Sequence, residues 1–151
     1  MRDRDVRLLK AFSDYYVQLK GHWVAIRRGI SQPSETWPEG YRPCSGGSED
    51  DFRFELYGVK CYLGFGLGFE AGSTMFRGVL EYGVIRPRWR LSSHPEERAI
   101  VKRLTFDTQG NINGDLGHAN EFEAVHCSFL ANNVKALVEA YYDVGEAEPK
   151  K

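Results

Sequence analysis

The stretch that decides the fold is residues 51–69, DFRFELYGVKCYLGFGLGF. Its apolar residues fall at every second position, first Phe52, Phe54 and Leu56, then Val59, Cys61, Leu63, Phe65, Leu67 and Phe69. Successive side chains of a β-strand point to opposite faces, so this period of two predicts two strands with one buried face each. Tyr57-Gly58 between them predicts a turn or bulge.

A third strand is expected from Thr74 to about Ile85, because Phe76, Leu80, Tyr82 and Val84 share one face of that stretch. Ala71-Gly72-Ser73 is typical of a turn, so residues 59–69 and 74–85 should form an antiparallel hairpin. Residues 98–107 are ambiguous between helix and strand, but alternation favours a strand in their second half, followed by a turn at 107–111. We expect one more strand from about Asn120 to Phe129.

Helices are expected at both ends of the chain. Residues 3 to about 28 carry apolar side chains at spacings of three and four, and Gly21 is a point where this helix could be interrupted. A second helix is expected to begin at Asn132 as its cap and to end at Gly145. The predicted fold class is therefore α+β, a mostly antiparallel β-sheet flanked by an N-terminal and a C-terminal helix. The apolar face of the first helix is predicted to contain Val6, Leu9, Phe12, Tyr16, Leu19, Trp23 and Ile26.

The domain organisation expected is one α+β domain over 1–145 and a solvated tail over 146–151. Residues 29–50 form a Pro/Gly-rich loop, and a connection of this length is usually functional or disordered. Its aromatic residues Trp37 and Tyr41 favour a flap that packs back onto the domain. Residues 86–97 are predicted to be a loop that leads into a short helix.

Composition excludes several classes of protein. The 151 residues carry a net charge of -1, which gives no bulk attraction to nucleic acid or to anionic membranes. No apolar run is long enough for a transmembrane helix, and the first residues lack the apolar core of a signal peptide. The three cysteines are far apart in the sequence and odd in number, which is typical of free thiols in a reducing compartment. A cytoplasmic protein without metal or cofactor is expected.

The glycine strip Gly64, Gly66 and Gly68 is the most unusual local feature. Glycine at every second position leaves one face of a strand without side chains, so another group should approach the backbone closely there. That group could be an internal helix or ring, which is the interpretation we favour, or a ligand or partner in a shallow groove. The spacing does not fit a phosphate-binding GxGxxG loop, because Phe69 stands at the last glycine position. The docking hypothesis uses Trp37, Tyr41, Tyr62, Gly64, Gly66, Gly68, Arg77 and Glu81.

A second hypothesis is a small enzyme with its site under the 29–50 loop. Residues 118–127, HANEFEAVHC, supply Glu121, Glu123 and His126 as candidates for acid–base chemistry. On a strand, His126 and the neighbouring Cys127 would diverge, so they could not form a nucleophile–base pair. The stretch 107–115 does not fit a calcium loop, because Ile112 stands at its glycine position.

Nucleic-acid binding is a third hypothesis. It rests on Arg86, Arg88 and Arg90, which alternate around Trp89 and could contact phosphates and stack on bases. We nevertheless consider this partner unlikely for a chain of neutral balance. The sequence favours a non-catalytic binding protein of the inhibitor, immunity or regulatory type, with a protein partner and with a small-molecule ligand as an alternative.

Overall fold

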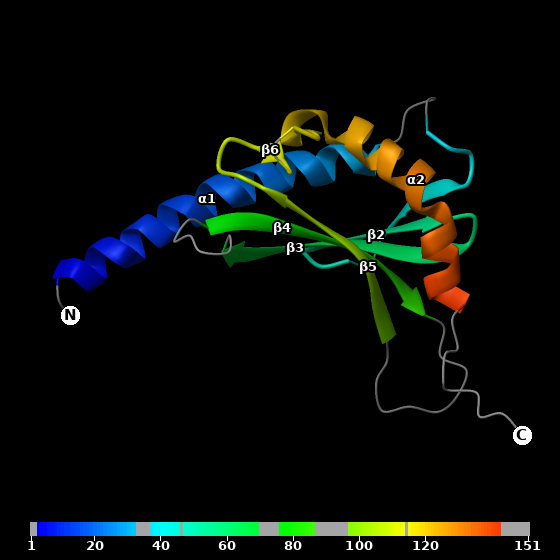
Figure 1. Cartoon of the computed structure of the whole chain (residues 1–151), viewed down its shortest axis with the longest axis horizontal. Helices are drawn as coiled ribbons and strands as arrows, with labels where there is room; N and C mark the ends of the chain where they lie inside the picture. Colours follow the sequence, from blue (N-terminus) through cyan, green and yellow to red (C-terminus); the bar gives the residue numbers. More distant parts are fainter. Residues whose placement is uncertain are drawn as a thin grey trace, which may run out of the picture.

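The computed structural model describes residues 3–32, 37–45, 47–69, 76–86, 97–113 and 115–142. Within these ranges the chain forms two helices, a seven-stranded sheet and a short 3-10 turn (Figure 1). The predicted α+β class is confirmed. The elements are α1 (Asp3–Ser31), β1 (Tyr41–Cys44), β2 (Asp51–Leu56), β3 (Val59–Phe69), β4 (Phe76–Arg86), β5 (Glu97–Phe106), β6 (Asn111–Ile112), β7 (Gly117–His118), η1 (Ala119–Glu121) and α2 (Phe122–Tyr142).

The sheet is an antiparallel meander in which strand order follows chain order, β1 to β7. Both helices lie on the same side of the sheet: α1 runs along it and α2 crosses one end of it (Figure 1). The core lies between the helices and this inner face of the sheet. It contains Trp23 and Ile26 of α1, Leu63 and Tyr82 of the central strands, and Phe129 of α2.

Local sequence explains the two central hairpins. Tyr57 and Gly58 both have positive φ, 52° and 85°, and Leu56 pairs with Val59 around them. A two-residue turn with two positive φ values matches the twist of the adjoining strands. The predicted turn and the antiparallel hairpin of β3 with β4 are confirmed. The stretch around residue 100, ambiguous in the sequence, is strand β5 throughout.

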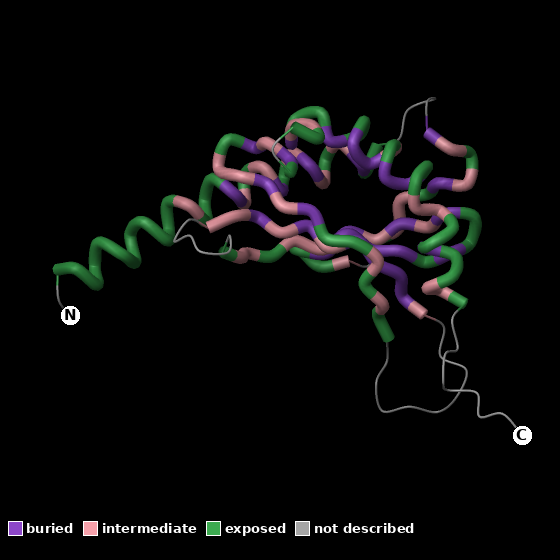
Figure 2. Tube along the Cα trace, in the orientation of Figure 1, coloured by how far each residue is buried: buried purple, intermediate pink, exposed green. Residues whose placement is uncertain are grey.

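Helix α1 is continuous through Gly21 and ends at Ser31. Only its C-terminal half is buried, through Leu19, Trp23, Ile26 and Ile30. The first turns project beyond the sheet and are exposed (Figure 2), whereas the Phe12 and Tyr15 rings reach Phe76 at the start of β4. The predicted apolar face is therefore buried only in part, because the helix extends past the end of the sheet. The exposed members are Val6, Leu9, Phe12 and Tyr16.

The strand predicted from Asn120 to Phe129 is wrong, and so is the helix cap at Asn132. These residues belong to η1 and to one continuous helix that begins at Phe122. The alternation of Glu121 and Glu123 with apolar neighbours suggested a strand. The buried residues, however, recur at positions i, i+3, i+4, i+7 and i+8 from Phe122, which is the helical period. They are Phe122, Val125, His126, Phe129, Leu130 and Leu137.

The stretch 29–50 is less irregular than predicted, since it holds the end of α1 and the strand β1. Its aromatic residues do pack back onto the domain. The Trp37 and Tyr41 rings stack with centroids 4.5 Å apart, and Tyr41 Oη donates to Ile30 O at 2.8 Å. The short helix predicted near Ser93 lies outside the described residues. Neither α1 nor α2 has the apolar length that spanning a membrane requires.

Candidate functional site

The outer face of the sheet, which neither helix covers, holds most of the predicted docking residues. Antiparallel pairing sets Gly64 opposite Glu81 and Gly68 opposite Arg77. A Cβ atom built on Gly66 would meet nothing within 4 Å. The favoured interpretation of the glycine strip as an internal packing site is therefore wrong at Gly66, where the strand faces open space. The predicted docking residues on this outer face are Tyr62, Gly64, Gly66, Gly68, Arg77 and Glu81.

Tyr62 forms the floor of the outer face. Its ring crosses Gly83 on the neighbouring strand, where a Cβ atom would lie 2.7 Å from the ring and 2.4 Å from Ala99 O. The Arg98 guanidinium lies 4.7 Å from the centroid of the same ring. Tyr62 Oη donates to Glu81 Oε2 at 2.9 Å. Burial, and then the nearby Glu81 carboxylate, raise the pKa of Tyr62, so this phenol is a neutral structural donor.

The outer face carries more positive than negative charge, although the chain as a whole does not. Arg98 Nη2 lies 3.0 Å from Asp51 Oδ2, and Arg103 Nε lies 3.3 Å from Glu81 Oε1. Among the described strands, register places six basic residues there against three acidic ones, so the ion pairs leave an excess of cations. The basic residues are Arg42, Arg53, Lys60, Arg77, Arg98 and Arg103, and the acidic ones are Asp51, Glu55 and Glu81.

Trp37 and Tyr41 lie on the opposite side of the sheet from the glycine strip. Both are buried, with 7% and 6% of their surface exposed. They pack around His126, with ring centroids 5.3 Å and 5.4 Å from the imidazole. The structure therefore divides the eight predicted docking residues into six on the outer face and two in the core.

His126 is fully buried in an aromatic cluster. Its Nδ1 atom lies 2.5 Å from Tyr82 Oη, while Nε2 has no hydrogen-bond partner among the described residues. Burial lowers the pKa of His126 to about 3, so the imidazole is neutral at physiological pH. Glu121, at the end of η1, and Glu123, in the first turn of α2, are exposed. Within the described residues, these three side chains do not line a common cavity.

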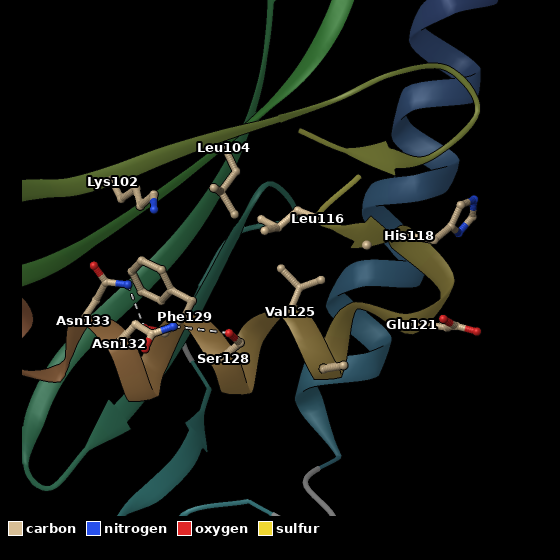
Figure 3. A pocket seen from close by; sticks show the side chains of 12 residues that line it. Lys102, Leu104, Leu116, His118, Glu121, Val125, Ser128, Phe129, Asn132 and Asn133 are labelled. Atoms are coloured by element: carbon tan, nitrogen blue, oxygen red, sulfur yellow. Dashed lines mark hydrogen bonds between the residues drawn. The ribbon is translucent and has the colours of Figure 1, made fainter. Parts of the chain in front are cut away.

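A cleft of about 330 Å³ between β5 and α2 was not foreseen from the sequence. Leu104, Leu116, Val125 and Phe129 line its middle, and Lys102 stands at one end (Figure 3). The signal for it was the helical spacing of the apolar residues in the first part of α2, up to Phe129, where a strand is expected from the sequence. Asn133 lies near Lys102, and His118 and Glu121 lie at the other end.

His118 has both ring nitrogens engaged. Nε2 lies 2.7 Å from Gln109 O, and Nδ1 accepts the Asn120 N–H at 3.0 Å. The ring therefore fixes the turn after β5 to the start of η1, which gives it a structural task. Across the described ranges, no three His, Cys, Asp or Glu side chains gather as metal ligands would.

The arginines of the nucleic-acid hypothesis are only partly described. Arg86 Nε donates to Ala140 O at 2.8 Å, so this side chain caps the end of α2. Arg88 and Arg90 lie outside the described residues.

No family model, curated protein or solved structure matches this chain. Its function therefore has to be argued from its own surfaces.

Proposed function

We propose that this chain is a non-catalytic binding protein that docks an acidic surface of a protein partner on the outer face of its sheet. The observation that carries the proposal is the concentration of six basic residues on the one sheet face that the helices leave open. Complementary charge steers association and selects partners. An acidic protein surface is the occupant whose charge fits this face.

The shape of the outer face supports docking of a broad partner. Gly66 is exposed and meets no neighbouring atom, so a partner can approach the backbone there. The surrounding side chains are held by contacts within the face, as Tyr62 is by Glu81 and Arg98. A surface that is ordered before binding loses little side-chain entropy when a partner arrives.

The enzyme alternative has less support from the geometry. An acid–base residue must reach the proton that it transfers, whereas His126 is enclosed by rings and engaged with Tyr82.

The proposal includes a cytoplasmic location. Free thiols at Cys44, Cys61 and Cys127, all within the described ranges, support a reducing compartment.

The test uses a steric block and a matched control. Gly66→Trp places a large ring in the middle of the outer face, and Gly21→Trp places the same ring on exposed α1; neither Cβ would meet an atom within 4 Å. Tagged wild type and both variants are used to capture partners from lysate, with folding checked by circular dichroism. Binding that Gly66→Trp abolishes and Gly21→Trp preserves supports the outer face. A partner retained equally by all three proteins would refute it.

Charge reversal tests the acidic nature of the partner. Arg103→Glu changes an outer-face charge, and Lys135→Glu makes the same change on exposed α2. Only Arg103→Glu should weaken binding, and added salt should weaken wild-type binding, because exposed charges are screened. Capture of nucleic acid in place of protein would favour the third hypothesis. Loss of binding in both variants alike would contradict a localised surface.

A further inference from the structure

Strand β5 has an open edge next to the cleft. On one side it pairs with β4 from Glu97 to Phe106, with a shift of register at Val101, but β6 pairs with it only through Phe106 and Ile112. One further contact closes the corner: Thr105 N donates to Asn113 Oδ1 and Asn113 N donates to Thr105 O, both at 2.8 Å. From Thr105 back to Glu97, no described strand pairs with this edge.

The direction of the Thr105 contacts shows which backbone groups of β5 are available. Both polar groups of Thr105 point away from β4, toward Asn113. Backbone direction alternates along a strand in an antiparallel ladder, so the N–H and C=O of Arg103 point the same way. No residue in the described ranges pairs with them. An unpaired donor and acceptor on an edge strand are a template for an added strand.

The cleft lies on the inner side of this edge and extends between β5 and α2 (Figure 3). Leu104, Val125 and Phe129 supply an apolar wall, and Leu116 stands toward the closed corner. Lys102 is exposed at the other end, and no carboxylate in the described part of the chain pairs with it. Lys102 and Leu104, two residues apart on β5, therefore present a cationic and an apolar group on the cleft side of the edge.

We propose that the open edge of β5 binds an extended segment of a protein partner as an antiparallel strand whose sequence is apolar–any–acidic. The middle residue exchanges both backbone hydrogen bonds with Arg103. The residue before it then stands opposite Leu104 and places an apolar side chain in the cleft. The residue after it stands opposite Lys102 and places its carboxylate beside the ammonium group. Antiparallel addition is favoured because its pairing is the more stable per residue and continues the existing sheet.

This site differs from the outer face in position and in what it recognises. The cleft lies on the helix side of the sheet, so binding there does not require the outer-face proposal to hold. Recognition depends on backbone hydrogen bonds and two side chains. The outer face, in contrast, depends on the total charge of a broad surface.

The probe is a short fluorescein-labelled peptide with capped ends, in which valine and glutamate flank one threonine. Fluorescence anisotropy should show binding, and ¹⁵N spectra should show the largest amide shift and exchange protection at Arg103. N-methylation of the central threonine removes one hydrogen bond and should weaken binding at least about threefold. Replacing the glutamate by lysine should weaken binding as well. The full chain is used throughout.

Protein variants provide the matched controls. Lys102→Glu should reverse the preference between the glutamate and the lysine peptides. Arg103→Pro should weaken peptide binding much more than Arg103→Ala does, because only proline removes the backbone N–H. If Arg103→Pro does not fold, the N-methylated peptide decides the same point. Any one of three results would overturn the proposal: no binding at about millimolar peptide, equal binding of the N-methylated peptide, or shifts mapped away from β5. A dimer formed through β5 in the free protein would also overturn it, since a second copy would then occupy the edge.

Discussion

Tyr82 Oη lies 2.5 Å from His126 Nδ1 in the centre of the core, and their rings stack at an interplanar angle of 14°. Tyr82 belongs to β4 and His126 to α2, so this contact fixes the C-terminal helix to the middle of the sheet. Both side chains are fully buried. The hydrogen bond thus satisfies two polar groups that water cannot reach.

Removing one side chain of the Tyr82–His126 pair should destabilise the fold by more than the loss of the hydrogen bond itself. We expect Tyr82→Phe and His126→Phe each to lower the free energy of unfolding by about 1–3 kcal/mol, because each leaves a buried polar group unpaired. The double variant should lose less free energy of unfolding than the two single losses added together, since it leaves no unpaired polar group of this pair. Urea unfolding of the four proteins measures this. Strictly additive losses would show that the two residues are not coupled.

The same histidine should make stability depend on pH. Burial lowers its pKa to about 3 in the folded chain, against about 6.5 in an unfolded chain. Between these values only the unfolded chain binds the proton, so the free energy of unfolding falls as the pH drops. The slope due to His126 should approach about 1.4 kcal/mol per pH unit, and its contribution should be complete above about pH 6.5.

The control for this pH effect is His126→Phe, which removes the titrating group. Urea unfolding at several pH values between about 3.5 and 7 should give a steeper dependence for wild type than for the variant. Parallel curves for the two proteins would mean that His126 is protonated equally in the folded and unfolded chains.

Two glycines on the same sheet face should respond oppositely to valine. Gly83→Val places a Cβ atom 2.4 Å from Ala99 O, and overpacking of this kind costs about 1–3 kcal/mol. Gly66→Val meets no atom within 4 Å and should be neutral or stabilising by about 0.5–1 kcal/mol, because glycine weakens a strand. Thermal unfolding of both variants measures the contrast. A destabilised Gly66→Val protein would mean that the glycine strip does have an internal contact.

The two halves of α1 should differ in their contribution to stability. Leu19 is completely buried, and Leu19→Ala should cost about 2–5 kcal/mol. Leu9, on the projecting half, is 57% exposed, and Leu9→Ala should change stability by no more than about 0.5 kcal/mol. Chemical denaturation of the two variants compares the positions. A similar cost at Leu9 would place that residue in an interface.

The three cysteines should differ in how fast a thiol reagent labels them in the folded protein. Burial raises the pKa of Cys61 to about 12, and its side chain has 1% of its surface exposed. Cys44 and Cys127 are half-buried. A thiol reagent near neutral pH should therefore label Cys44 and Cys127 in the folded protein, and Cys61 only after unfolding, as peptide mass mapping would show. Rapid labelling of Cys61 in the folded protein would indicate that β3 opens locally.

Local patterns were sufficient where one short-range signal dominated. The alternation around Leu63 predicted β3, and the Tyr57-Gly58 pair predicted the turn before it. They failed at Glu121 and Glu123, where a brief alternation of charged and apolar residues hid the longer helical period. A strand needs only a few alternating residues, so a helix with charges at its start can imitate one.

The candidate site was predictable only in part. Strand parity alone puts Tyr62, Gly64, Gly66 and Gly68 on one face, and the sequence grouped them correctly. Trp37 and Tyr41 were joined to them because they are aromatic and lie in a loop, but the loop folds over the other face. Nothing local distinguishes an aromatic residue that faces solvent from one that covers the core.

What the sequence by itself determined was the α+β class, the two terminal helices and the central hairpins, because these follow from side-chain periods and turn residues within a few positions. The tertiary structure alone decided which sheet face the helices cover, and therefore that the basic residues gather on the other. It also decided that His126 is enclosed and that β5 keeps an open edge beside α2. These properties depend on contacts between residues far apart in the chain, such as Tyr82 with His126, and no local pattern encodes them.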